Sequence, residues 1–171
     1  MERTLTQVST RREGVASSSG AEISVHCEAL LITSGSAPEF IDITDDVQRI
    51  VAEAGARFGQ VTVYSTHTTA AIKVNEHEPL LLQDMARTLQ QLAPHHADYE
   101  HNDFSRRTVN IEDGECANGH AHCQHLFLST SETIPIVDGR ASLGQWQRIF
   151  LVELDQPRQR RVLVNVIGVA S

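Results

Sequence analysis

Histidine is the residue type whose number and placement in this sequence point most directly to chemistry. The 171 residues include nine histidines. His67 lies in a hydroxyl-rich run, STHTTAA, at positions 65–71. Six others fall in a long polar stretch: His95, His96, His101, His120, His122 and His125. Neutral imidazole is a common ligand of divalent metals and a general acid or base near neutral pH, so these segments are candidates for a metal or catalytic site.

The pair His120 and His122 is two positions apart. In a β-strand such a pair shares one face and can chelate an ion. The alternative is a polar loop whose histidines are solvated, and the HxH spacing alone does not decide between the two. Ser65 lies close to His67, but neighbouring chain positions rarely give the geometry of a nucleophile and its base.

Two charged residues are further candidates. Glu76 fits a general acid or base, or a group that orients a ligating histidine, and it equally fits a helix start, where the helix dipole favours acids. Arg140 follows a glycine in a tight turn and can present its guanidinium to a phosphate, or simply lie on the surface of a hairpin. Trp146 is expected in the core. Three arginines near the last hairpin are expected to be solvated: Arg158, Arg160 and Arg161.

The hydrophobic pattern predicts two helices. Apolar residues at helical spacing predict a first helix that begins near Thr44 or Asp45 and is stopped by Gly59. A second helix is expected to begin near Glu78-Pro79 and to end at Pro94. Its predicted buried face consists of Leu81, Leu82, Met85, Leu89 and Leu92.

Alternating apolar residues predict several strands, among them 133–137, 149–154 and 162–169. Because only two helices interrupt these strands, the sequence predicts an α+β fold, a single-domain and mostly antiparallel β-sandwich or barrel with two flanking helices. Residues 1–21 carry no sustained apolar period and are expected to be a flexible leader before one domain at 22–171.

Composition restricts the partners. Asp and Glu number 22 against 14 Lys and Arg, for a net charge of −8, which argues against nucleic acid and an anionic membrane surface. No apolar run approaches the ~20 residues of a membrane span. Three cysteines without a CxxC motif, and the lack of a secretory signal pattern, predict a cytoplasmic location.

Six blocks of the sequence, in order between about Phe40 and Gly168, resemble the YjbQ-like family, whose members are often called secondary thiamine-phosphate synthase. The blocks are STHTTAAI at 65–72, VNE at 74–76, YEHN at 99–102, GHAH at 119–122, TIP at 133–135, and GR followed by LGQWQRIFL from 139. One departure is Cys123-Gln124, which stands where the family often has a lysine after its AH pair. If that lysine contacts phosphate, its loss affects phosphate binding.

The resemblance implies a single-domain β-sandwich of distorted jelly-roll type with flanking helices, which assembles as a homotrimer. It also implies a histidine site that holds a divalent metal. It implies that His67, His101 and His122 bind one ion, most simply zinc, and leave a coordination position open. Asn102 and Glu76 are expected to orient these ligands. His120 is a weaker candidate, and the remaining histidines are expected to be dispensable: His26, His77, His95, His96 and His125.

The implied function is a metal-dependent enzyme that acts on a phosphorylated small molecule. In its most specific form it joins a pyrimidine pyrophosphate to a thiazole phosphate and releases pyrophosphate. Glu76 and Arg140 are the expected catalytic residues. Four residues are expected to bind substrate: Thr68, Asn75, Asn102 and Arg140. Two alternatives remain: a metal-dependent hydrolase with water as nucleophile, and a non-enzymatic trimer that binds a small ligand or a metal.

Overall fold

A computed structural model describes residues 8–17 and 23–170. Its helices are α1 (Thr44–Ala54), α2 (Pro79–Leu92), the short 3-10 helix η1 (Glu100–Asn102) and α3 (Gly119–His125). Its strands are β1 (Val8–Ser17), β2 (Ile23–Thr33), β3 (Glu39–Asp42), β4 (Phe58–Ser65), β5 (Ala70–Glu76), β6 (Ser131–Val137), β7 (Arg140–Ala141), β8 (Gln147–Glu153) and β9 (Gln159–Val169).

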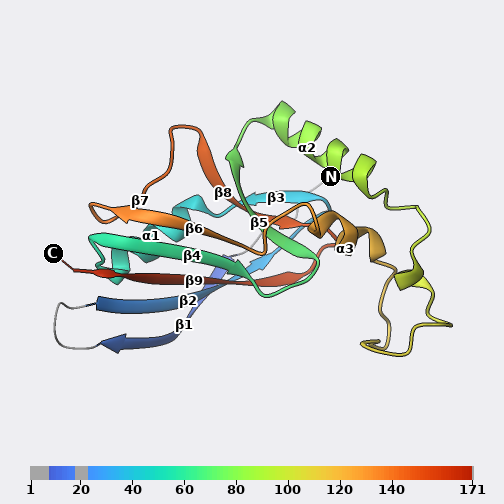
Figure 1. Cartoon of the computed structure of the whole chain (residues 1–171), viewed down its shortest axis with the longest axis horizontal. Coiled ribbons are helices and arrows are strands. Elements are labelled where there is room, and N and C mark those ends of the chain that lie inside the picture. The colour runs from blue at the N-terminus through green and yellow to red at the C-terminus, as the bar shows by residue number, and fades with distance from the viewer. Residues whose placement is uncertain (1–7, 18–22, 171) are drawn as a thin grey trace.

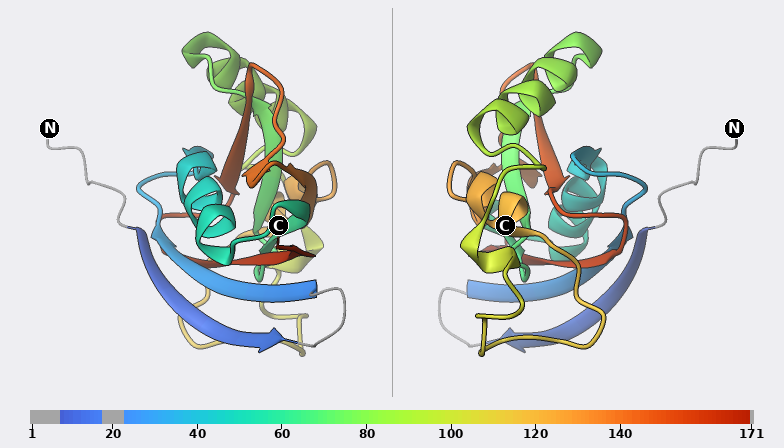
Figure 2. Two further views of the ribbon diagram at one scale, coloured as in Figure 1. Left: turned by 90° about the vertical axis from the view of Figure 1, so that its left-hand side faces the viewer. Right: turned by 90° about the vertical axis from the view of Figure 1, so that its right-hand side faces the viewer.

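The strands form two antiparallel sheets. The larger has six strands in the order β1-β2-β9-β4-β6-β7, and the smaller has three in the order β3-β8-β5 (Figure 1). The six-stranded sheet curves, and α1 lies on its concave side (Figure 2). The predicted α+β sandwich of antiparallel strands is therefore confirmed.

The main core lies between the two sheets and is closed by α1. It consists of aliphatic side chains from both sheets and the helix, including Leu30, Ile50, Val63, Leu151 and Val164. Burial of each such side chain stabilises the fold by roughly 1.5–3 kcal/mol relative to its exposure. Because strand side chains alternate between faces, the inward-facing residues of β2, β4 and β9 all point into this core.

Strand β8 is buried on both faces. Ile149 and Leu151 face the main core, whereas Phe150, Val152 and Leu154 face a second core beneath α2 and α3. The continuous apolar run of β8 follows from this double burial. The molecule thus has three layers, namely the six-stranded sheet, the three-stranded sheet, and the α2–α3 layer.

Helix α1 agrees with the prediction except at its end. Val47, Ile50 and Val51 are buried, as their spacing indicates. The helix ends at Gly55, which adopts a left-handed conformation with φ of 68°, and the predicted stop at Gly59 is wrong. Phe58, predicted to continue the apolar stripe, is the first residue of β4.

Helix α2 begins as predicted. The carboxylate of Glu78 accepts hydrogen bonds from the backbone N–H groups of Leu80 and Leu81, at 2.9 and 2.8 Å, and so caps the helix. Of its predicted buried face only Leu89 is buried, and Leu92 is 51% exposed. Within the described ranges no helix is long and apolar enough to cross a membrane.

Two regions differ from the sequence-based expectation. Part of the predicted leader, residues 8–17, forms β1 and pairs with β2 along its length, whereas residues 1–7 and 18–21 lie outside the described part of the chain. The division into a leader and a domain at 22–171 stays a prediction. The polar stretch 95–125 contains η1 and α3, so a third α-helix joins the two predicted ones.

A buried ion pair joins the two sheets at one end. Glu153, at the end of β8, is fully buried, and its carboxylate accepts a hydrogen bond of 2.6 Å from Nε of Arg160 on β9. The same carboxylate accepts hydrogen bonds from the hydroxyl of Ser34 and from two backbone N–H groups, while Arg160 also donates to the hydroxyl of Thr69. Every polar atom of the carboxylate is therefore satisfied without water.

We expect Glu153→Ala to lower the free energy of unfolding by about 3–5 kcal/mol, because it leaves the Arg160 charge buried without its partner. Urea denaturation measures this change. The double variant Glu153→Leu/Arg160→Met should recover most of the loss, since both charges are then absent. The control is Arg87→Ala, which removes an exposed ion pair with Asp84 and should cost less than about 1 kcal/mol. Equal losses for Glu153→Ala and the control would contradict the assignment.

Candidate functional site

A cleft of about 670 Å³ lies at the end of the sandwich where β4 ends and where β5 and β9 begin. In Figure 1 this end faces α3. We call it the histidine cleft, because its lining includes three histidines and three arginines: His67, His101, His122, Arg107, Arg158 and Arg160. The fold thus brings the three predicted histidines together from three separate segments.

The hydroxyl-rich run at 65–71 builds one wall of the cleft. The hydroxyl of Ser65 donates to the carbonyl of Ala70 at 2.7 Å and closes the turn, and Thr66 donates to the carbonyl of Arg161 at 3.0 Å. The backbone N–H of Arg161 donates to Nε2 of His67 at 2.9 Å. Because Nε2 accepts this bond, the proton of neutral His67 lies on Nδ1.

The opposite wall depends on a close approach of η1 and α3. A side chain at Gly119 would place its Cβ 2.5 Å from Cβ of Tyr99, so only glycine fits at this contact. The backbone N–H of Gly119 donates to the side-chain oxygen of Asn102 at 2.9 Å. This packing brings the rings of His101 and His122 to a centroid separation of 4.6 Å.

The surroundings of two imidazoles in the cleft, His67 and His122, favour their neutral form by lowering the pKa of each ring. The pKa of His67 is lowered from its ordinary value of 6.5 by burial and then by the charge of Arg160. The pKa of His122 is lowered by burial and then by His101. Neutral imidazole is the form that binds a metal or accepts a proton, so both rings are prepared for such chemistry at pH 7.

Each arginine of the cleft has an acidic partner. Arg107 donates to Glu115 at 2.6 Å, which lowers the pKa of that carboxyl, and Arg158 pairs with Asp155 at 2.7 Å. Arg158 differs from the others because its Nε is buried and has no hydrogen-bond partner among the described residues. One donor of Arg158 is therefore not used by the described residues.

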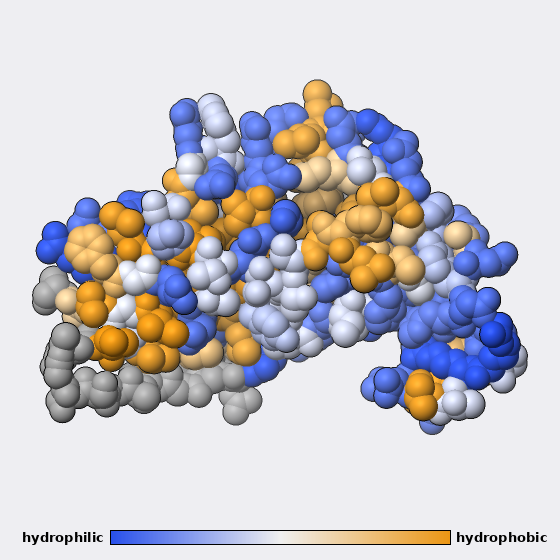
Figure 3. All heavy atoms as spheres, viewed as in Figure 1, coloured by the Kyte–Doolittle hydropathy of each residue, from blue (hydrophilic) through white to orange (hydrophobic). Residues whose placement is uncertain are grey.

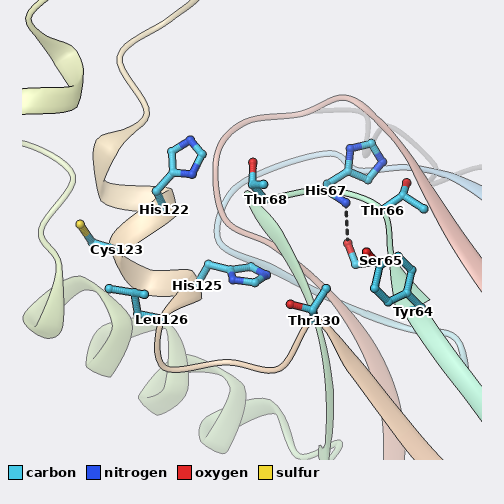
Figure 4. Close-up of a pocket in the computed structure, with 10 residues that line it drawn as sticks. All are labelled: Tyr64, Ser65, Thr66, His67, Thr68, His122, Cys123, His125, Leu126 and Thr130. Atoms are coloured by element: carbon cyan, nitrogen blue, oxygen red, sulfur yellow. Dashed lines mark hydrogen bonds between the residues drawn. The ribbon is translucent and has the colours of Figure 1, made fainter. Parts of the chain in front are cut away.

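A second hollow of about 450 Å³ adjoins the cleft and shares His67, Thr68 and His122 with it (Figure 4). Its lining also includes Cys123 and His125. Thr68 lines both hollows, and its role in binding substrate stays a prediction.

A three-histidine metal site needs donor atoms aimed at one point. Nε2 of His67 is already engaged by Arg161, and Figure 4 shows the ring of His67 apart from that of His122. Among residues 8–17 and 23–170, no group of three or more His, Cys, Asp or Glu side chains is arranged to hold a metal ion. The three rings share a cleft but do not fit one ion in this conformation, so the zinc site stays a prediction.

The comparison with known families decides the identity of the fold. The family model described as UPF0047 protein YjbQ-like matches residues 28–169, most of the chain. The chain belongs to the YjbQ/UPF0047 family.

Relatives of this YjbQ-family chain occur in archaea and bacteria. A UPF0047 protein of Methanothermobacter thermautotrophicus is 36% identical over 149 residues, which cover 87% of this chain and 96% of the relative. The UPF0047 protein YugU of Bacillus subtilis is 31% identical over 142 residues, which cover 82% and 98%. Among solved structures, a YbjQ-like protein of unknown function from Sulfolobus solfataricus matches with a TM-score of 0.76 and 32% identity, over 85% of this chain and 99% of that chain.

Three residues predicted for the YjbQ-family site lie elsewhere on the chain. Glu76 is exposed at the far end of β5 from Thr68, in a hollow with His77 and Trp146. Asn75 donates a hydrogen bond to the sulfur of Met85 on α2. Arg140 is exposed on the edge strand β7, which Figure 1 shows at the opposite end of the sandwich from α3. None of the three lines the histidine cleft of this chain.

The expected burial of Trp146 is wrong, and the structure also shows where the HxH pair and Asn102 lie. His120 and His122 lie on α3 and not on a strand, so they point in different directions, and His120 is 2% exposed while His122 lines the cleft. Trp146 is 65% exposed and is not a core residue. Asn102 acts on the backbone of α3 and does not line the cleft.

The arginines and Glu115 were missed by sequence reasoning. Arg160 is 2% exposed, which contradicts its expected place at a solvated hairpin end. The alternation of β9 holds the signal, because Arg160 has the same parity as the buried Val162 and Val164. Nothing in the sequence pattern around Glu115 or Arg107 indicates their pairing.

The cleft and its surroundings predict a pH dependence of stability. Four histidines have a pKa lowered by burial: His67, His120, His122 and His125. As the pH falls below 6.5, the unfolded chain takes up protons that the folded chain does not, so the free energy of unfolding falls.

Urea denaturation between about pH 7.5 and 5.5 measures this drop. We expect the drop to be smaller in His125→Gln, which removes one of the four groups. An identical pH dependence in the two chains would contradict the lowered pKa of His125.

Proposed function

We propose that the histidine cleft binds and transforms a phosphorylated small molecule. The observation that carries this proposal is the convergence of three imidazoles and three guanidinium groups in one cleft. Guanidinium groups recognise phosphate oxygens through directed, charge-assisted hydrogen bonds. The imidazoles provide proton-transfer groups beside the bound anion.

Arg158 is the proposed phosphate contact. Its side chain lines the cleft and is 37% exposed, so a ligand can reach the guanidinium group, whereas its Nε is buried without a hydrogen-bond partner in the described ranges. Arg107 and Arg160 are held in short pairs with Glu115 and Glu153. These carboxylates balance the charges of Arg107 and Arg160, so the two side chains have fewer donors free for a ligand than Arg158. Arg158 therefore has the phosphate-binding role that was expected of Arg140.

The proposed reaction in its most specific form is the transfer implied by the family. The nitrogen of the thiazole phosphate attacks the methylene carbon of the pyrimidine pyrophosphate. A carbon–nitrogen bond forms, the carbon–oxygen bond breaks, and pyrophosphate departs with the electron pair. Arg158 stabilises the charge that develops on pyrophosphate, and His67 donates a hydrogen bond from Nδ1 to the leaving group.

The divalent metal predicted from the family resemblance remains part of this proposal. His101 and His122 are the pair with ring centroids at 4.6 Å, and Nε2 of His101 is buried without a hydrogen-bond partner in the described chain. No step above uses a metal, because His67 does not join this pair here. The cytoplasmic location likewise stays a prediction.

The test supplies both thiamine precursors to the purified protein and measures thiamine phosphate. We expect turnover by the wild type, a large loss of kcat in His67→Ala, and a KM for the pyrimidine pyrophosphate raised about 10- to 100-fold in Arg158→Gln, which loses a charged hydrogen bond. The control is Arg87→Gln, on the exposed side of α2, with unchanged kinetics. Product formation no greater than that of His67→Ala would overturn the transferase.

The same assay distinguishes the alternatives. Release of phosphate from the pyrimidine pyrophosphate without the thiazole phosphate indicates a hydrolase. Saturable binding of pyrophosphate without turnover, weakened in Arg158→Gln, indicates a binding protein. Absence of both turnover and binding refutes the phosphate site itself.

We further propose that the chain forms a homotrimer through the α2–α3 layer. Leu80, Leu92, Leu126 and Phe127 are each more than half exposed there. They adjoin an apolar groove lined by Leu89 and neighbouring side chains, and Figure 3 shows hydrophobic residues gathered over both helices. An apolar patch of this kind marks a protein interface more often than a free surface. In such an assembly, Glu76 or Arg140 of one copy can approach the histidine cleft of another copy.

Light scattering tests the assembly. We expect a mass three times the 18.9 kDa of the chain, and a smaller mass for Leu126→Glu/Phe127→Glu, which places charges in the patch. The control is Val109→Glu, which changes an exposed apolar residue outside the patch. A wild type that scatters as an 18.9 kDa monomer contradicts the trimer.

A further inference from the structure

A second group of histidines lies outside the histidine cleft. His95 and His96 follow α2 and are exposed, and His120 lies on α3. The rings of His95 and His96 are 4.6 Å apart between centroids, and those of His95 and His120 are 4.3 Å apart. The family resemblance gives no role to His95 or His96, and the histidine cleft contains none of the three.

His120 has a buried nitrogen with no hydrogen bond. The residue is 2% exposed, and its Nδ1 has no partner among the described residues. The ring makes a hydrogen bond with the backbone of Leu154, which leaves the lone pair of Nδ1 available. An imidazole held through one nitrogen, with the other nitrogen bare, has the arrangement of a metal-ligating histidine and its orienting partner.

His95 and His96 already have the spacing of two ligands. Their Nδ1 atoms are 3.2 Å apart. Two nitrogens bound at about 2.0–2.1 Å to a tetrahedral zinc ion lie roughly 3.3 Å from each other. One of the two nitrogens donates a hydrogen bond to the other, so an ion bound to both requires the donor ring to carry its proton on its other nitrogen and the two rings to turn toward a shared point.

The segment that carries this pair is fixed against α3. Gln124 donates from its side chain to the carbonyl of Ala93 at 2.9 Å, and the backbone N–H of His95 donates to the side chain of Gln90 at 3.2 Å. Gln124 lies one helical turn after His120, on the same face of α3. The backbone of 93–95 is thus held beside His120.

We propose that His95, His96 and His120 bind a divalent transition metal that prefers imidazole, such as zinc, nickel or copper. The three donors do not converge on one point before the ion arrives, in agreement with the lack of a ready three-donor group in the described chain. His95 and His96 are exposed, so their rings reorient in solution, whereas His120 supplies the fixed donor. The fourth position is left to water or another ligand.

Zinc titration by calorimetry, with cobalt absorption as a second readout, tests this site on the intact chain. We expect His96→Ala to weaken zinc binding at one site by 10-fold or more and to remove the corresponding visible bands of bound cobalt. His96 is exposed, so its substitution leaves the fold intact, and circular dichroism verifies this. His120→Gln, which keeps a polar side chain in the buried position, should have the same effect.

Two control variants separate this site from other histidines. His77→Ala removes an exposed histidine outside the group and should leave zinc affinity within twofold of the wild type. His122→Ala affects only a metal bound in the histidine cleft, so the proposed function and this site fail independently. Wild-type affinity in His96→Ala, no zinc binding by the wild type, or loss of all binding in His122→Ala alone would each overturn the proposal.

Discussion

The buried pair of Glu153 and Arg160 is the constraint on which the rest of the molecule depends. It connects the last residue of β8, in one sheet, to the start of β9, in the other. A charge inside a protein is tolerated only when it is paired and fully hydrogen-bonded, and the hydroxyls of Ser34 and Thr69 complete this requirement. The two sheets are therefore held in one relative position at the end of the sandwich where the cleft lies.

The cleft chemistry follows from that fixed end. Arg160 contacts Thr69 on one side and, after burial, is the next contribution to the lowered pKa of His67 on the other, so the guanidinium that joins the sheets also favours a neutral imidazole nearby. A cationic ring beside a fixed guanidinium is disfavoured. The ion pair that joins the sheets is therefore also part of the electrostatic environment of the cleft.

The secondary-structure elements that depend on local apolar periodicity could be predicted from the sequence. The strands, both long helices and the antiparallel sandwich follow from apolar spacing, and the family blocks singled out His67, His101 and His122, which share a cleft. Partnerships formed only by tertiary contact were missed. Arg160 was expected in solvent because three nearby arginines look like a charged turn. Helix α3 was missed because four of its seven residues are glycine or histidine, which have little helix propensity. Its stability comes from packing against η1 through Gly119 and Asn102.

Helix α3, which was not predicted, determines where the two side chains of the HxH pair point. On a strand, His120 and His122 would face one ligand, but on α3 they are about 200° apart around the axis. His122 is thereby directed to His101 in the cleft, while His120 is directed inward beside His95. One short helix thus supplies a histidine to two different groups on opposite sides. Because both groups depend on the same contact at Gly119, a change there affects them together, whereas a change in either ring affects only its own group.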